Sequence, residues 1–249
     1  MGEFDAASRA NEEVLMLPDQ TVESLFDDLI EEAAESLLKR YQEFSGESTL
    51  PVPVESIAEH LLGYDLEITN EGLFSDPNFL GGISFETNTI FVNAAVEGHE
   101  GRYTFTVAHE VGHHVLHKDV YDANINDRSQ ILCREQKKKP LIERQADRFA
   151  AASMMPRTLV QNSNAVRSQP RAAKTLSQAI ELANSVQAEC GFSNVSLSAM
   201  VNRLKDLSLI SDEIPYQSGN RWRMRHRPSW KYLLLNNLRR IFFSKRRSQ

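Results

Sequence analysis

Cysteine is scarce in this sequence of 249 residues, which contains only Cys133 and Cys190 and no Cys-x-x-Cys pair. Two cysteines cannot form the disulfide framework of a small secreted protein, and the missing pair argues against a structural zinc site made of thiolates. The cysteine content fits a reducing compartment, and we therefore expect a cytoplasmic protein.

Long hydrophobic runs are missing as well. No apolar stretch approaches the roughly 18 to 20 residues that a helix needs to span a bilayer. The first thirty residues are acidic and lack the charged-then-apolar pattern of a secretory signal. Both absences predict a soluble protein.

Acidic residues are absent from one end of the chain. The segment Ile214 to Gln249 contains ten Lys and Arg and no Asp or Glu. The preceding 213 residues hold 18 basic and 34 acidic side chains, a net charge of −16. An acidic body with a basic tail indicates a tail that binds an anionic partner, or one that docks on its own body.

The sequence does contain an ordered series of helical and strand patterns. Apolar residues recur at helical spacing over Thr21 to Phe44, and a second helical pattern over Val54 to Leu62 ends at Gly63. A strand-like segment, Tyr64 to Thr69, precedes two short runs that predict a hairpin over Gly81 to Val92.

The remaining sequence predicts four helices and one long loop. A helix is expected over Tyr103 to His117, followed by a polar loop over Lys118 to Lys139. A second helix runs from Pro140 to about Met155, because proline suits the first turn of a helix and Pro156 ends this one. Two further helical patterns lie around Ala172 to Cys190 and Ser196 to Leu207.

The helix from Tyr103 contains the motif His-Glu-x-x-His at His109, Glu110 and His113. Two histidines four residues apart on a helix point the same way, so both can bind one ion at about 2.0–2.1 Å. Glu110 is rotated by about 100° from His109 and can reach a water molecule at the ion without ligating it. The alternative is a pair of surface histidines without a metal.

The helix that follows Pro140 offers the third protein ligand that such a site needs. Glu143 is the candidate, and Asp147 lies one turn further along the same face. Asp147 could accept the outer N–H of a ligand histidine and so fix its tautomer. Alternatively, Glu143 pairs with an arginine of its own helix, and Asp147 pairs with Arg148 or a lysine.

Other potential metal ligands near the motif are predicted to be structural. His114 points away from the face that His109 and His113 share. His117 lies a turn too far along the helix to join a tetrahedral site with both of them. Cys133 lies in a polar loop without a matching partner.

Three segments in this order, IFVN, YTFTVAHEVGHHVLH and ERQADRFAAASMMP, resemble the ImmA/IrrE family of metallo-endopeptidases over Pro51 to Pro156. The resemblance implies a thermolysin-like gluzincin core in which His109, His113 and Glu143 bind the metal. It also implies that Glu110 is the general base, and that the substrate is a protein. Family members cleave DNA-binding repressors in mobile-element or stress regulation.

The motif and the resemblance together predict an α+β fold with a zincin-like peptidase core, in which a small antiparallel sheet lies beside the HExxH helix. Residues 1–45 would form an N-terminal extension with an amphipathic helix, and residues 46–160 the metallopeptidase domain. Residues 161–213 would form a helical region similar to a helix-turn-helix, and residues 214–249 a basic tail. Zinc is the expected ion, with manganese or iron as alternatives.

Amide hydrolysis at such a site involves residues beyond the metal ligands. Glu110 would take a proton from water and pass it to the leaving amine. Tyr103, Tyr121 or His117 could stabilise the oxyanion, and the sequence does not choose among them. The hairpin over Gly81 to Val92 could offer a strand edge to an extended substrate, or it could be a plain core hairpin.

The segment Ser196 to Leu207 resembles the recognition-helix region of a helix-turn-helix, with Ser196 or Ser198 at its N-cap. Its only cations are Arg203 and Lys205, which are few for phosphate contacts, so packing or protein docking is favoured over DNA binding. The alternative functions are a DNA-binding or protein-binding regulator that uses the peptidase fold as a scaffold, and a zinc-binding protein without turnover.

The basic tail predicts an amphipathic helix, because its apolar residues fall on one helical stripe and its cations on the other faces. Such a helix can lie on an anionic membrane, bind nucleic acid or dock on the acidic body. Docking needs no further partner and is favoured over membrane or nucleic-acid contact. The stripe consists of Trp230, Leu234, Leu238, Ile241 and Phe242.

Overall fold

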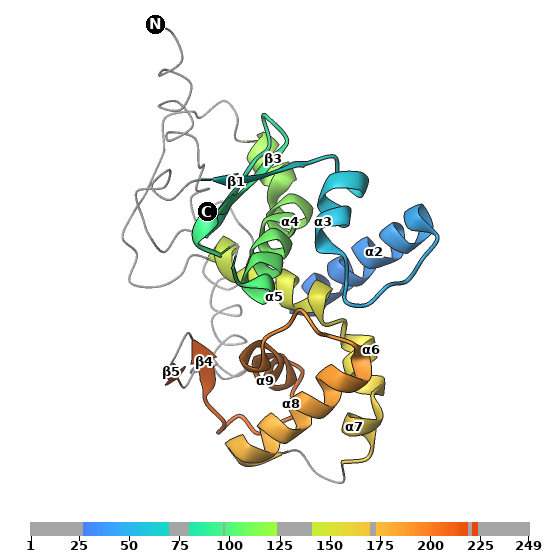
Figure 1. The fold of residues 1–249 in the computed structure, drawn as a ribbon, viewed down its shortest axis with the longest axis vertical. Helices are drawn as coiled ribbons and strands as arrows, with labels where there is room; N and C mark the ends of the chain where they lie inside the picture. The colour runs from blue at the N-terminus through green and yellow to red at the C-terminus, as the bar shows by residue number, and fades with distance from the viewer. Residues whose placement is uncertain are drawn as a thin grey trace, which may run out of the picture.

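A computed structural model describes residues 27–69, 80–96, 98–123, 141–169, 173–218 and 221–223. Figure 1 shows a small sheet with its helices in the upper part of the molecule, and a second group of helices with a hairpin in the lower part. Within the described residues, no helix has both the length and the apolar character needed to cross a membrane.

Three helical segments come first. Helix α2 (Asp27–Ser45) buries Ile30, Ala34 and Leu37, and the predicted turn before Asp27 lies outside the described residues. Helix α3 (Val54–Ser56) continues into the π-helical turn η1 (Ile57–Leu61). Gly63 follows with a φ of 75°, the left-handed conformation that commonly ends a helix and favours glycine.

A three-stranded sheet follows, made of β1 (Asp65–Thr69), β2 (Gly81–Ser84) and β3 (Thr89–Asn93). The predicted hairpin is confirmed, since β2 and β3 are antiparallel neighbours, but β3 lies in the middle and runs parallel to β1. The predicted antiparallel sheet is therefore mixed. Residue alternation identifies a strand but carries no information on the direction of its neighbour.

The sheet leads through the turn η2 (Ala94–Val96) into the long helix α4 (Glu100–Ala123). This helix is longer at both ends than the sequence predicted, and the prediction of a loop was wrong for residues 118–123. The polar stretch contains an aromatic residue, Tyr121, whose packing holds the last turn of the helix against the sheet region. The ring of Tyr121 packs against Phe85, with 4.8 Å between the ring centroids.

Helix α5 (Leu141–Met154) packs against both α4 and α2, and the chain then enters the lower part of the molecule (Figure 1). The short helices α6 (Arg157–Asn162) and α7 (Asn164–Arg167) come next. They were not predicted, because one or two turns carry too little periodic signal. Helices α8 (Leu176–Cys190) and α9 (Leu197–Asp206) follow, and β4 (Tyr216–Ser218) and β5 (Arg221–Arg223) form an antiparallel hairpin.

Helix α9 is packed inside the lower part. Arg203 and Lys205, its two cations, are 0% and 2% exposed, so neither can contact a phosphate from this position. Arg203 binds Glu31 of α2, and Lys205 donates hydrogen bonds to the backbone carbonyls of Asp212 and Ile214. The predicted likeness of residues 161–213 to a helix-turn-helix is therefore not confirmed, and α9 has a packing role.

Helix α2 connects the upper and lower parts through its acidic residues. Three arginines, from α5, α6 and α9, each bind one of these carboxylates: Arg148 binds Asp27 at 3.0 Å, Arg157 binds Asp28 at 2.7 Å and Arg203 binds Glu31 at 2.5 Å. Residues 27–45, which the sequence analysis assigned to an extension, therefore pack against the helix that carries Glu143. The predicted tail helix over Trp230 to Phe242 lies outside the described residues.

Candidate metal centre

Helix α4 brings the motif residues to the sheet and to α5. Its inner side is apolar, with Val107, Ala108 and Val111 almost fully buried, and this burial fixes how the helix is rotated. His109 and His113 are one helical turn apart, so their imidazoles extend from one face. Packing of the apolar side therefore determines where the two histidines point.

A glycine in the motif lets α5 approach α4 closely. A Cβ atom added to Gly112 would lie 3.1 Å from the Phe149 ring and 3.3 Å from Cα of Ala146. Such a contact is tighter than ordinary packing allows, so a larger residue at Gly112 would push α5 away. The close approach places Glu143, in the first turn of α5, opposite the two histidines.

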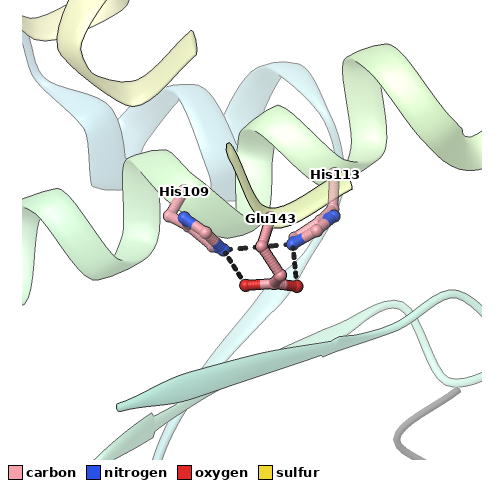
Figure 2. Close-up of side chains that lie close together, drawn as sticks. All are labelled: His109, His113 and Glu143. Atoms are coloured by element: carbon pink, nitrogen blue, oxygen red, sulfur yellow. Dashed lines mark hydrogen bonds and ion pairs between the residues drawn. The ribbon is translucent and has the colours of Figure 1, made fainter. Parts of the chain in front are cut away.

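Three donor groups converge between the helices, as Figure 2 shows. The Nε2 atoms of His109 and His113 are 3.1 Å apart, and the Glu143 carboxylate places one oxygen 3.3 Å from each of them. Ligands at 2.0–2.1 Å around a tetrahedral ion are separated by about 3.3–3.4 Å. The side chains are therefore spaced as the ligands of one ion would be.

The electrostatics of the cluster reflect these close contacts. Burial disfavours a charged His109, but hydrogen bonds with Asp147 and Glu143 outweigh it and raise the pKa of His109 to about 10. Burial would raise the pKa of the Glu143 carboxyl, but hydrogen bonds from His109 and His113 hold it well below its usual range. Without a metal, His109 is therefore protonated near pH 7 and balances the charge of the Glu143 carboxylate.

Asp147 lies behind His109. Its Oδ1 atom is 3.0 Å from Nδ1 of His109, on the side of the ring away from Glu143. A carboxylate in this place accepts the outer N–H and leaves the Nε2 lone pair free for a metal. The structure therefore brings together the four side chains that the sequence analysis selected as ligands and ligand partner.

Glu110 is only 5% exposed and lies where α4 meets the edge strand β2. A Cβ atom on Gly81 would collide with the Thr106 methyl group and would lie 3.3 Å from Oε1 of Glu110. Gly81 therefore allows the backbone of β2 to pass directly beside the carboxylate. The sequence analysis placed Gly81 in the hairpin but missed this contact, for which a glycine in a strand was the available signal.

The sequence analysis named His117 but missed its partners, and it did not single out Gln145. His117 is 2% exposed and places its Nδ1 atom 3.1 Å from Nδ1 of His113. Its Nε2 atom lies 3.0 Å from Oε1 of Gln145, which is also buried. These contacts remove His117 from the candidates for oxyanion stabilisation. Its spacing of four residues from His113 could have indicated a contact with that ring.

His114, which the sequence analysis considered near the motif, lies away from the cluster. His114 forms a 2.9 Å hydrogen bond with the hydroxyl of Tyr64, in agreement with the structural role that was predicted. Cys133 lies outside the described residues.

Comparison with known protein families bears on this site. The family model of the IrrE N-terminal-like domain, Peptidase_M78, matches residues 53–176, from the residue before α3 to the first residue of α8. A comparison with curated proteins finds no match. The matched segment contains the whole cluster of His109, His113 and Glu143. Through residues 53–176, the chain belongs to the ImmA/IrrE family of metallopeptidases.

Proposed function

We propose that the chain is a zinc-dependent endopeptidase that hydrolyses a peptide bond in a protein substrate. The observation that carries this proposal is the convergence of His109, His113 and Glu143, with donor atoms 3.1–3.3 Å apart. Two imidazoles and one carboxylate suit zinc and leave its fourth position open, which is typical of a catalytic rather than a structural site. Manganese is the alternative ion.

The residues around the cluster fit amide hydrolysis. A zinc ion held there would supply Lewis acidity toward water and the scissile carbonyl. Glu110 would accept a proton from the attacking water at its carboxylate and donate it to the leaving amine. Its place beside the ligands, but outside the triangle of donor atoms, suits this role. Asp147 would keep the His109 ring in its ligating orientation.

The position of strand β2 is consistent with a peptide substrate. Among the described residues β2 pairs only with β3, so its other edge has backbone groups that an extended chain could bind. A Cβ atom on Gly81 would lie 3.3 Å from Oε1 of Glu110, so β2 passes close to the proposed general base. A substrate added along β2 would therefore run past the carboxylate.

We further propose that the substrate is a DNA-binding repressor. This assignment rests on the ImmA/IrrE resemblance, and charge supports it. The 213 residues before the tail have a net charge of −16, which favours encounter with a basic DNA-binding protein. The alternative of a DNA-binding regulator receives no support from α9, whose cations are buried.

The test combines metal analysis with an assay of cleavage. The full-length chain is purified, its zinc and manganese contents are measured, and it is incubated with a helix-turn-helix repressor from the same genome. We expect about one zinc per chain and cleavage that stops with a chelator and returns with added zinc. Bound zinc without cleavage of any protein tested would favour a binding protein without turnover.

A further inference from the structure

The two histidines of the cluster are supported in different ways. The outer nitrogen of His109 faces a carboxylate, Asp147, whereas the outer nitrogen of His113 faces another imidazole, His117. His117 in turn contacts Gln145 of α5 at 3.0 Å. The three side chains His113, His117 and Gln145 thus form a chain of hydrogen bonds that leads from the cluster into the core.

The chemistry of Gln145 and of the metal site determines which atom is the donor and which the acceptor in each of these hydrogen bonds. The amide oxygen of Gln145 can only accept, so Nε2 of His117 must carry a proton and donate it. In the metal site proposed above, His113 binds through Nε2, so the remaining N–H of its ring is on Nδ1, 3.1 Å from Nδ1 of His117. Only one proton can lie between the two Nδ1 atoms, so Nδ1 of His117 is the acceptor. His113 must then donate from its own Nδ1.

We propose that His117 and Gln145 are positioning residues: His117 accepts the Nδ1–H of His113, Gln145 accepts the Nε2–H of His117, and together they keep the Nε2 lone pair of His113 directed at the metal position. This inference rests on the metal site proposed above. His117 touches neither substrate nor metal, because its ring lies on the far side of His113 and is buried. It acts only through the orientation and tautomer of a ligand.

The chain also affects the charge of the site. Glu143, Asp147 and Glu110 already bring three carboxylates close to the metal position, one more than a divalent cation balances. A further carboxylate behind His113 would add to this buried negative charge, which is costly. The imidazole and amide orient His113 without adding that charge.

The hydrogen bonds can be observed directly in the zinc-loaded, full-length protein. With ¹⁵N-labelled histidine, NMR distinguishes the protonated nitrogen of each ring, and a coupling across N–H···N reports the bond itself. We expect His117 to be protonated at Nε2, a slowly exchanging Nδ1–H on His113, and a coupling between the two Nδ1 atoms. A proton on Nδ1 of His117 would overturn the proposal.

Two substitutions at one position separate positioning from packing. His117→Phe keeps a ring but has no acceptor, and we expect its zinc affinity to fall by about 10- to 100-fold in competition with a chelator. His117→Asn places an amide oxygen near the position of Nδ1, and we expect it to retain most of the affinity. Asp119→Asn, an exposed change on the same helix, is the matched control.

The outcomes distinguish this inference from the proposed function. A folded His117→Phe protein with wild-type zinc affinity would overturn the positioning role while leaving the metal site intact. A wild-type protein that binds no zinc would overturn both. If His117→Phe does not fold, Gln145→Leu tests the same chain from its other end. It should weaken zinc binding, and unchanged affinity would contradict the proposal.

Discussion

The α4–α5 pair and helix α9 both bury polar side chains, with opposite consequences. In α9, every hydrogen-bonding group of Arg203 and Lys205 that the structure describes is directed at a fixed protein partner. Between α4 and α5, the Nε2 atoms of His109 and His113 face each other and a carboxylate at 3.1–3.3 Å. Neither histidine has a stable partner there without a proton or a cation.

The comparison shows how to tell a functional polar cluster from a structural one. A buried ion pair such as Arg203–Glu31 satisfies itself and needs nothing from solution. A cluster of acceptors is unfavourable until a cation enters, and that requirement makes it a binding site. Substitutions in the first region should therefore change the free energy of unfolding, whereas those in the second should change metal binding and catalysis.

The largest effect is expected at the third ligand. Glu143→Ala should lose its bound zinc and all activity, because two neutral imidazoles alone hold the ion weakly. Asp147→Ala should bind zinc only about 10- to 100-fold more weakly, since it acts through His109. Zinc content after dialysis checks both. Equal zinc in Glu143→Ala and wild type would show that another residue is the ligand.

Glu110→Gln should separate binding from catalysis within the same cluster. The amide keeps the shape of the side chain but cannot accept the proton, so turnover should fall by about 10²- to 10⁴-fold. Zinc content and thermal unfolding should match those of the wild type. The measurement is kcat/KM on the cleaved protein substrate, and near-normal turnover would rule out Glu110 as general base.

In the structural region, Arg203→Ala should destabilise the protein by about 3–5 kcal/mol, because it leaves the Glu31 carboxylate buried and unpaired. Denaturant unfolding of the metal-free protein measures this free energy. The double variant Arg203→Met with Glu31→Leu removes both charges at similar volume and should lie closer to the wild type. A loss of zinc affinity in these variants, with the fold intact, would break the contrast between the regions.

The affinity of the cluster for zinc should depend on pH. Because contacts with Asp147 and Glu143 raise the pKa of His109 to about 10, the metal-free site holds a proton near pH 7 that zinc must displace. Raising the pH removes this proton, so affinity should rise by about tenfold per pH unit below pH 10. Calorimetry in buffers of different ionisation enthalpy should detect the released proton. Asp147→Asn should flatten the slope, and a pH-independent wild type would contradict the argument.

The smallest effect is expected where an ion pair is exposed. Arg157 and Asp28 are 27% and 80% exposed in their side chains, so solvent screens their attraction. Arg157→Ala should therefore cost less than about 1 kcal/mol of unfolding free energy. Salt should reduce the difference between variant and wild type. A loss as large as that of Arg203→Ala would mean that α2 depends on all of its arginine contacts equally.

The sequence alone was sufficient for the local features. The spacing of His109 and His113 follows from the helical repeat, and Gly63 and Pro156 mark helix ends through their own backbone preferences. The choice of Glu143 followed from the need for a third protein ligand and from the family resemblance, and Asp147 lies one turn further along the same face. Each of these inferences depends on contacts within one element or between neighbouring elements.

Tertiary structure decided what depends on partners far along the chain. Three features join residues that no periodic pattern links: the direction of β1 relative to β3, the buried ion pair of Arg203 with Glu31, and the passage of β2 at Gly81 close to Glu110. The same applies to Gln145, which is unremarkable in sequence and reaches His117 only because Gly112 lets the helices approach. Hydrophobic periodicity in the sequence indicates which face of a helix or strand is buried. Which residues pack against that face is determined only by the tertiary structure.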